Sequence, residues 1–492
     1  MEYGIWSLVP AAVTIAVALL TKRVALALFT GVVGGVAVLK FGRWAAFFKA
    51  LWHYLFEAFT DPERLKIVLF IMLIGGLLKL IARSGAYDKF ARSLAQKLNT
   101  PRKSRLATMG ISLMLFFDDY ANVLISGAAL RDINARNRVS PAMLAYMVDV
   151  IAVMASIMLV STWASFEGAT MRDAAAEIGL PGSMAELFIS AMPYHFYTFS
   201  AIFLVFLVAL TGRWFGRFAD TQPFSPGKPQ KLHPRVRPAH TLVPILTVIL
   251  GGFLGLFLLG YIILRHSGQP ITLVGMLGAA PSVDVLIGAT LLALVILAAM
   301  LVRQGILRFA SMPGPLLRGA HGMVGVGLVI LTATALAGVS ADLGTGAFIA
   351  GQLAAYIRPE ILPVLIYLMA MLITVATGFS WSSMAIVMPI AYPMAVANGV
   401  PEFIPVLSAA VITGAVSGEH FIPYSEKCVM TAAATQITPL YHIRTQLPQT
   451  LAAFLAGGLA FTLYGYGWGV PAALGAAFAL LLLLHVAFAR RK

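Results

Sequence analysis

Hydrophobic residues occur in long, unbroken runs along the whole chain, and short polar stretches separate these runs. An α-helix needs about 20 predominantly apolar residues to cross the bilayer core, and several runs approach or reach that length. The runs do not alternate between apolar and polar positions as the strands of a membrane barrel do. The pattern predicts an all-α polytopic membrane protein with about 11 transmembrane helices, at residues 5–20, 24–40, 65–82, 141–163, 188–212, 241–265, 283–302, 322–340, 403–418, 447–466 and 471–489.

Composition supports this class. Of the 492 residues, 60% are hydrophobic and only 11% are charged, whereas a soluble domain is about 25% charged. No cleavage site follows the first run, so we expect a retained helix and not a signal peptide. The single cysteine, Cys428, excludes a disulfide framework and a cysteine-based metal site.

The charged residues are unevenly distributed among the loops. Residues 83–105 and 213–240 are strongly basic, whereas residues 164–187 are acidic and are expected to form an outer loop. By the positive-inside rule, both basic loops, residues 303–318 and the C-terminus lie in the cytoplasm. The net charge of +15 therefore reflects membrane topology and excludes nucleic acid as a partner. We expect a multi-pass protein of the cell inner (plasma) membrane.

The stretch LMLFFDDYANVLISG, residues 113–127, carries two adjacent aspartates inside an apolar run. Each charge at the centre of a membrane helix costs about 2.5–3.5 kcal/mol on insertion scales. The chain enters this run from the cytoplasmic side and must leave on the same side before residue 141. We therefore expect residues 106–138 to form a re-entrant or broken helical hairpin, which is tolerated only where it is buried or lines a cavity.

Residues 378–395, GFSWSSMAIVMPIAYPMA, have a similar layout. Phe117 precedes Phe379 by 262 residues, and Pro141 precedes Pro401 by 260, so the spacing from hairpin to following helix is nearly constant. The span count gives the two hairpins opposite orientations. We expect a first repeat over residues 1–240, including the basic loop 213–240, and an inverted second repeat over 241–492. Paired interrupted segments of this kind point to a transporter's binding site.

The first polar cluster contains Asp118, Asp119 and Asn122. Carboxylates followed by an amide one turn later supply hard oxygen ligands, so Asp118 and Asp119 are candidate Na⁺ ligands. Two adjacent carboxylates also favour proton binding when no cation is present. The alternative is structural: the acids cap a helix or pair with Arg131 or Lys79.

Three further clusters lie within or beside apolar runs. The candidate ion- or substrate-binding residues in them are Asp149 with Ser156, Ser161 and Thr162; Ser380, Ser382 and Ser383; and Glu419, His420, Ser425, Glu426 and Lys427. Structural alternatives are a buried hydrogen-bonding role for Asp149, close helix packing at the serines, and mutual neutralisation of Glu426 and Lys427.

Other chemistry has little support. His53, His195, His321 and His442 are isolated in the sequence, without metal-ligand spacing. Metalloprotease, serine-hydrolase and phosphate-loop motifs are absent from the sequence, so we expect no enzyme and no cofactor beyond Na⁺ or H⁺ as a transported or coupling ion.

The chain resembles the NhaC family of sodium/proton antiporters, within the broader ion-transporter superfamily. The motifs are FFDDYAN at 116–122, LAYMVD at 144–149, STW at 161–163, GFSWSSM at 378–384 and SGEHFIPYSEK at 417–427. The resemblance implies a secondary transporter that exchanges sodium and protons, or in some members organic anions or amino acids. It also implies that Asp118, Asp119, Asn122 and Asp149 belong to the ion or substrate pathway.

The last motif departs from the family pattern. The family reads close to GDHCSPISDTT where this chain has Glu419, Glu426 and Lys427 in place of two aspartates and a small hydroxyl residue. A lysine ammonium can occupy the position of a bound cation, which weakens the case for sodium, or it can bind a carboxylate.

Three hypotheses follow: a monovalent cation/proton antiporter, an ion-coupled transporter of a small organic solute such as an amino acid or carboxylate, and a channel or receptor. Adjacent acids without an aqueous-pore signature argue against the third. The expected partners are the lipid bilayer and a small cation or organic solute. A homodimer is one option for the assembly, which the sequence leaves open.

Overall fold

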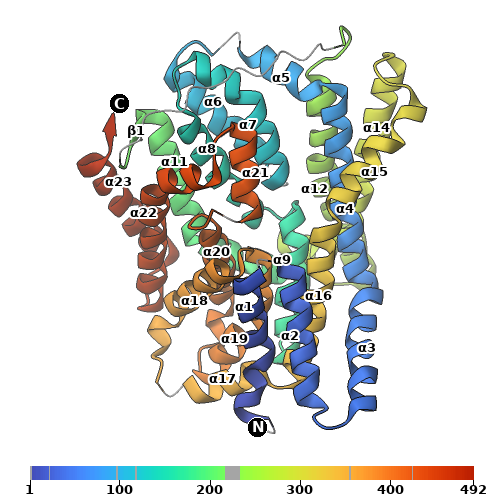
Figure 1. The fold of residues 1–492 in the computed structure, drawn as a ribbon, viewed down its shortest axis with the longest axis vertical. Helices are drawn as coiled ribbons and strands as arrows, with labels where there is room; N and C mark the ends of the chain where they lie inside the picture. Colours follow the sequence, from blue (N-terminus) through green and yellow to red (C-terminus); the bar gives the residue numbers. More distant parts are fainter. Residues whose placement is uncertain are drawn as a thin grey trace.

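The computed structural model describes residues 3–21, 23–95, 98–116, 119–216, 233–353, 356–423 and 425–491. These residues are almost entirely helical (Figure 1). The first eleven α-helices are α1 (Val9–Thr21), α2 (Val24–Leu39), α3 (Trp44–Thr60), α4 (Pro62–Ser84), α5 (Ala86–Ala95), α6 (Pro101–Met114), α7 (Asp119–Arg136), α8 (Pro141–Ile151), α9 (Thr162–Glu177), α10 (Met184–Ala191) and α11 (Phe196–Thr211).

The later helices are, on average, longer. They are α12 (Ala239–Ser267), α13 (Leu273–Ala279), α14 (Ser282–Arg303), α15 (Pro313–Gly322), α16 (Val324–Asp342), α17 (Thr345–Leu353), α18 (Leu362–Thr377), α19 (Ser380–Ala397), α20 (Ile404–Glu419), α21 (Glu426–Thr435), α22 (Pro439–Gly465) and α23 (Val470–Phe488). Short 3₁₀ helices are η1 (Gly4–Leu8), η2 (Ala152–Ile157), η3 (Met192–Tyr194), η4 (Phe309–Ser311), η5 (Pro359–Ile361) and η6 (Pro401–Phe403), and two-residue strands β1 (Arg213–Trp214) and β2 (Arg490–Arg491) pair antiparallel.

The fold confirms an all-α polytopic membrane protein. Within the described ranges, nine helices are long and apolar enough to cross a membrane, and counting each of two bent pairs as one span raises the number to eleven. The individual spans differ from the prediction. The runs at 5–20 and 24–40 form the short helices α1 and α2, of 13 and 16 residues, which pack against each other.

The prediction treats the candidate span Ser380–Ala397 as part of a hairpin and misses the span at Pro359–Thr377 altogether. Its helix α18 has only 16 residues between the charged turn at Glu360 and Gly378. Since the prediction accepted the 16-residue runs at 5–20 and 403–418, length alone does not explain the omission.

The predicted span at 141–163 is broken, and the predicted acidic outer loop at 164–187 is largely helical. Helix α8 ends at Ile151, η2 follows, and α9 begins at Thr162 after a bend of 48°. Ser161 starts α9 because its hydroxyl accepts a hydrogen bond from the Ala164 N–H. The first ten residues of α9 are buried, so this segment belongs to the protein interior.

Helices α6 and α7 form the hairpin predicted over residues 106–138. The Asn137 side chain donates to the Leu98 carbonyl at 2.9 Å, Asn134 to the Thr108 hydroxyl at 3.0 Å, and Asn122 to the Ser112 carbonyl at 2.8 Å. In these three bonds the residue number falls in α7 as it rises toward and along α6, so the two helices run antiparallel. The hairpin is confirmed, whereas the depth of its tip in the bilayer remains a prediction.

Helices α18 and α19 form a second hairpin around Gly378. At its tip, the Thr374 hydroxyl donates to the Ser383 hydroxyl at 2.8 Å. Each of the two hairpins contacts the broken span of the other region, because α21 packs against α7 and α9 packs against α19. These reciprocal contacts are those expected of an inverted repeat. The repeat boundary between residues 240 and 241 remains a prediction. Because α18 and α19 are each long enough to span the membrane, re-entry of this hairpin also remains a prediction.

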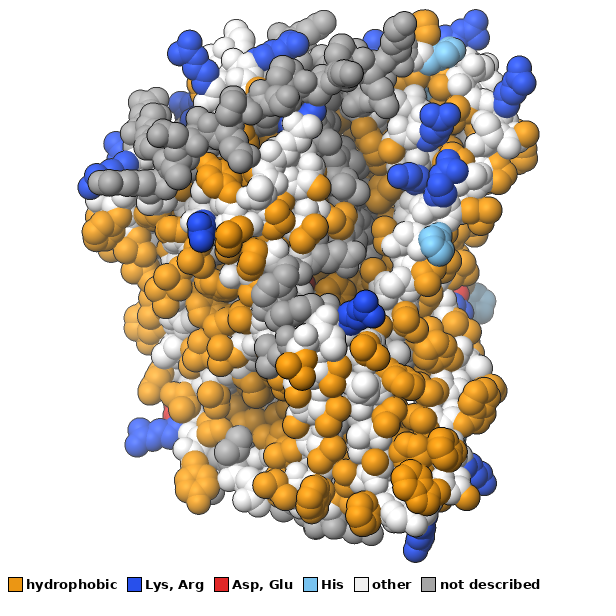
Figure 2. Space-filling view, in the orientation of Figure 1, with side chains coloured by type: hydrophobic (Ala, Val, Ile, Leu, Met, Phe, Trp, Pro, Cys, Tyr) orange, Lys and Arg blue, Asp and Glu red, His pale blue; other side chains and the backbone are white. Residues whose placement is uncertain are grey.

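The basic connections gather at one end of the molecule. Figure 1 places α5, the α14–α15 connection and the C-terminus at its upper end and the N-terminus at its lower end. In Figure 2, Lys and Arg side chains are most numerous toward the upper end, and hydrophobic side chains cover much of the remaining face. This shared end agrees with the predicted grouping of the basic loops on one side of the membrane.

Candidate functional site

Asp149 lies at the centre of a buried polar cluster formed by α8, α20, α21 and α22. Its side chain is 1% exposed. One carboxylate oxygen, Oδ2, lies 3.2 Å from His442 Nε2 and 3.9 Å from His420 Nε2. The other, Oδ1, accepts a hydrogen bond from the Thr431 hydroxyl at 3.4 Å and lies 4.0 Å from Lys427 Nζ. A buried carboxylate is therefore surrounded by donors from the second part of the chain.

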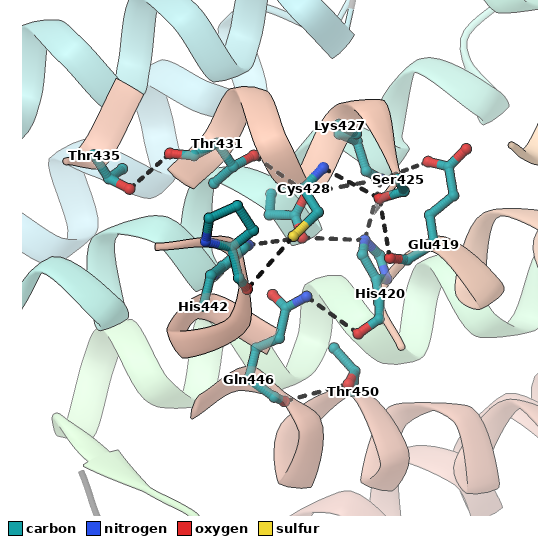
Figure 3. A network of polar contacts seen from close by, with 12 residues as sticks. Glu419, His420, Ser425, Lys427, Cys428, Thr431, Thr435, His442, Gln446 and Thr450 are labelled. Atoms are coloured by element: carbon teal, nitrogen blue, oxygen red, sulfur yellow. Dashed lines mark hydrogen bonds and ion pairs between the residues drawn. The ribbon is translucent and has the colours of Figure 1, made fainter. Parts of the chain in front are cut away.

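Lys427 lies between two carboxylates. Its ammonium is 4.0 Å from Asp149 Oδ1 and 3.6 Å from Glu419 Oε2, and it is 3.1 Å from His420 Nε2. All of these side chains are at most 4% exposed. Figure 3 shows Lys427, Glu419 and His420 converging where α20 ends and α21 begins. Ion pairs this deeply buried persist only when their charges and hydrogen bonds compensate one another.

The break between α20 and α21 brings these groups together. Helix α20 ends at Glu419, and α21 begins at Glu426 with the Ser425 hydroxyl accepting from the Cys428 N–H. The Ser425 hydroxyl also donates to the Glu419 carbonyl at 3.3 Å. The chain therefore turns within a few residues and places Lys427 beside the end of α20 instead of continuing away from it.

Glu419 also joins the cluster to the tip of the second hairpin. Its Oε1 accepts a hydrogen bond from the Ser380 N–H at 2.8 Å, at the first residue of α19. The N-terminus of a helix carries unpaired N–H groups and a positive end of the helix dipole, both of which stabilise a carboxylate. Displacement of the hairpin tip would therefore alter the charge balance of the cluster.

Aromatic side chains hold the same tip from the other side. Trp381 of α19 stacks on Phe166 with ring centroids 4.5 Å apart and meets Trp163 edge to face at 5.7 Å. These contacts join the STW motif to the GFSWSSM motif. Both motifs thus contribute packing around the cluster, in the geometries that aromatic pairs favour.

The structure joins some of the predicted site residues and separates others. Asp149, Glu419, His420 and Lys427 form the cluster, and Ser380 contributes its backbone N–H. The remaining serines have local hydrogen bonds: Ser156 to the Val153 carbonyl, Ser161 to the Ala155 carbonyl, and Ser382 and Ser383 to the Phe379 carbonyl. Thr162 is the first residue of α9 and Ser425 caps α21, so both lie at helix starts.

The first aspartate pair is only partly described. Asp118 and the Glu426 side chain lie outside the described residues. Asp119 is 4% exposed and begins α7, and Asn122 uses its amide N–H to hold α6. The Asn122 Oδ1 is buried without a hydrogen-bond partner among the described residues. A role for these residues as ion ligands remains a prediction.

Several residues of the cluster were missed from the sequence. His442, interpreted as isolated, makes the shortest contact with Asp149, and Tyr197 lies 2.5 Å through its hydroxyl from His420 Nδ1. Thr431 and Gln446 complete the surroundings, the latter donating to the His420 carbonyl at 3.2 Å. His442 is buried near the start of α22, in a polar stretch that precedes the apolar run predicted at 447–466, so the sequence offered no signal for its role.

The connected side chains carry unequal charge. Asp149 and Glu419 contribute two negative charges, Lys427 contributes one positive charge, and His420 and His442 are neutral unless protonated. Among the described side chains of this cluster, one negative charge is then left over. One monovalent cation or one proton would neutralise it, which is the relation expected when a cation and a proton compete for one site.

Comparison with known proteins identifies the family of the chain. The model of the Na⁺/H⁺ antiporter family matches residues 154–468. The chain belongs to this family. The matched region contains Glu419, His420, Lys427 and His442, whereas Asp149 and the first hairpin precede it.

Individual relatives of this antiporter-family chain are distant. A Haemophilus influenzae protein described as uncharacterized is 24% identical over 99% of this chain and 96% of its own length. The malate-2H⁺/Na⁺-lactate antiporter of Bacillus subtilis is 25% identical over 23% of this chain and 24% of its own length. The crystal structure of the YdaH transporter from Alcanivorax borkumensis shares the fold, with a TM-score of 0.55 and 17% identity over 87% of this chain and 90% of that one. The protein is a secondary transporter of the membrane.

Proposed function

We propose that this transporter exchanges a monovalent cation, first of all Na⁺, for protons across the cell inner membrane. One observation carries the proposal: among the described side chains, the buried cluster of Asp149, Lys427 and Glu419 has one more negative than positive charge. A carboxylate charge without a counter-ion is costly there, so the site favours binding either a cation or a proton.

The fold suggests how the bound ion changes sides. The site lies where two spans are broken, after α8 and between α20 and α21, and the tip of the α18–α19 hairpin touches Glu419. We propose that the two hairpin-containing regions move relative to each other, so that the cluster opens alternately to each side. With one Na⁺ or one H⁺ bound, the cluster is neutral and crosses at lower cost than the charged, empty cluster.

Exchange in proteoliposomes tests the proposal. An imposed sodium gradient should drive proton movement in the wild type, and Asp149→Asn and Glu419→Gln should each abolish it because both changes remove the residual charge. Glu402→Gln, at an exposed residue before α20, is the matched control and should exchange normally. Normal exchange in Asp149→Asn would refute the site.

Asp119→Asn in the same assay tests the first hairpin. Loss of exchange there, with normal exchange in Asp149→Asn, would move the ion site to the aspartate pair predicted from the sequence. Loss in both variants would support a pathway that uses both regions.

A second candidate function is transport of a small organic anion. A cavity of about 420 Å³ lies between the start of α2, the α15–α16 junction and the tip of the α18–α19 hairpin, and Arg23 lines it together with Thr377, Gly378 and Phe379. A guanidinium beside a cavity of this size suits a small carboxylate, and the name of the Bacillus subtilis relative includes malate and lactate.

Counterflow of labelled malate or lactate tests this candidate. Arg23→Gln should raise the half-saturating concentration at least tenfold if the guanidinium binds the carboxylate, whereas Arg265→Gln, at the exposed end of α12, should leave it unchanged. Sodium-driven proton movement without any uptake of organic anion would exclude this candidate.

A further inference from the structure

Glu167 is a buried acid that the Asp149 cluster does not use. It lies in the first half of α9, its side chain is 0% exposed, and both carboxylate oxygens are without a hydrogen-bond partner among the described residues. The sequence had assigned it to an outer acidic loop, where its charge would have been solvated. The interior location gives it a different chemistry.

A second acid of α9 provides a comparison, because its charge is compensated. Asp173, two turns later, forms an ion pair with Arg64 of α4 and lies 3.6 Å from Arg172. Asp173 is also partly exposed, at 36% of its side chain. Glu167 has neither solvent nor a cation in contact within the described residues.

The charged and titratable groups on the elements that pack against α9 have other partners or, like Lys79 and Arg83 in the second half of α4, are exposed. On α4, Arg64 pairs with Asp173, and Lys66 pairs with Glu63 and Asp284. Glu186 of α10 bonds to its own helix start, and Tyr392 of α19 pairs with Ser408. His195, after η3, contacts the Ala191 carbonyl. Of the groups on α9 itself, Arg172 lies beside Asp173, and Glu177 is exposed at the helix end.

A carboxylate in these surroundings would be an isolated charge in an apolar interior, which is far more costly than a neutral carboxyl group. We propose that Glu167 holds a proton in this conformation and is a proton-binding group of the transport cycle, separate from the Asp149 cluster. The inference rests on the proposed proton-coupled exchange and adds a second proton site to it.

The position of Glu167 connects that proton to the moving parts. Its neighbour Phe166 stacks on Trp381 at the start of α19, one residue after the N–H that binds Glu419. Gly168, on its other side, has so little space that an added Cβ would lie 3.0 Å from the Met184 carbonyl oxygen of α10. Because the Glu167 side chain is 0% exposed, water reaches it only if α9 separates from one of the elements packed against it, which include α10, α19, η2 and α4, so proton release is tied to a conformational change.

Infrared difference spectroscopy on the purified, full-length protein tests the protonation directly. The wild type at neutral pH should show the carbonyl-stretch band of a protonated carboxyl group, and Glu167→Gln should lose that band. Glu177→Gln, at an exposed acid on the same helix, should keep it. An unchanged band in Glu167→Gln would overturn the proposal, whatever the protein transports.

The pH profile of exchange in proteoliposomes tests the role in transport. Glu167→Gln, which mimics the permanently protonated acid, should flatten the pH dependence and lower the rate at least tenfold, whereas Glu167→Asp should keep a pH dependence with a shifted midpoint. A wild-type profile in Glu167→Gln would show a proton held only for structure and would overturn the proposal. If the wild type itself moves no protons, the proposed function fails while the infrared result still stands.

Discussion

Lys427 is the residue that distinguishes this site from a simple pair of acids. Lys427→Met would leave Asp149 and Glu419 without their shared counter-ion, and removal of one partner from a buried ion pair typically costs about 3–5 kcal/mol. The side chain is buried, so solvent cannot replace the lost charge. We expect a large fall in thermal stability in detergent, part of which sodium chloride restores and choline chloride at equal ionic strength does not.

Lys66 supplies the matched control for that measurement. It pairs with Glu63 and Asp284 while its side chain is 35% exposed, and exposed pairs contribute about 0–1 kcal/mol. Lys66→Met should therefore change stability little and show no sodium-specific recovery. A Lys427→Met protein as stable as the wild type, or equally stabilised by choline, would contradict a cation-like role for the ammonium.

At the residue scale, charge inside an apolar run was the useful signal. Asp149 and the Glu419–Lys427 block could be predicted because charges there need a partner or a function. The partners of these charges could not be predicted from the sequence, because Asp149 and His442 are 293 residues apart and their 3.2 Å contact depends on the packing of α8 against α22. Glu167 was misplaced because the acidic character of residues 164–187 suggested a solvated loop.

Among the helices, the tip of the second hairpin is the element most directly tied to the cluster. Gly378 has φ of +87° there, a conformation that costs other residues roughly 1–2 kcal/mol. Gly378→Ala should strain residues 377–380 and shift the Ser380 N–H away from Glu419. We expect a comparable loss in unfolding free energy together with a fall in exchange rate of roughly tenfold or more, as small displacements at a site produce.

Gly399, just after the opposite end of α19, is a control position that distinguishes the effect of backbone strain from an effect on function. Its φ is +71° and nothing lies within 4 Å of an added Cβ, so Gly399→Ala should lose a similar amount of stability without a loss of exchange. Thermal unfolding and proteoliposome exchange on both variants make the comparison. Equal effects of the two substitutions on exchange would show that the hairpin tip has no special role.

The first hairpin depends on Asn134. This side chain accepts from the Ser104 hydroxyl at 3.1 Å and donates to the Thr108 hydroxyl at 3.0 Å, joining α7 to α6. Each buried hydrogen bond contributes about 0.5–1.5 kcal/mol, so Asn134→Ala should speed amide hydrogen exchange several-fold in α6 and α7 but not in α14. Asn398→Ala removes only a local bond to the Met394 carbonyl at the end of α19. It should leave amide hydrogen exchange in α6 and α7 unchanged.

At the same scale, the hairpins show what a sequence can and cannot predict. Loop charges and the direction of the next span were enough to predict that residues 106–138 turn back, because the hairpin follows from topology alone. Helix α18 was missed although its apolar run is as long as others that were predicted to span. The unwinding of residues 158–161 was missed because Met158, Leu159 and Val160 are as hydrophobic as the residues of a membrane helix. Hydropathy measures transfer to lipid and not the need to bend around a binding site.

For the molecule as a whole, the distribution of basic residues predicts the orientation in the membrane. Figure 1 places the α14–α15 connection at the end that also holds α5 and the C-terminus, and the α2–α3 connection at the opposite end. The positive-inside rule assigns the first of these ends to the cytoplasm. The chain has a single cysteine, Cys428, 1% exposed, so a Cys428→Ala background should be unreactive and well suited to single-cysteine labelling.

In that background, Phe41→Cys in the α2–α3 connection and Ser311→Cys before α15 report the two ends, since both residues are exposed. A membrane-impermeant maleimide should label Phe41→Cys in intact cells and Ser311→Cys only after permeabilisation. The reverse pattern would invert the assigned orientation. Labelling of both in intact cells would mean that the two connections share one side, which would require an even number of crossings between residues 41 and 311 and would contradict the span assignment itself.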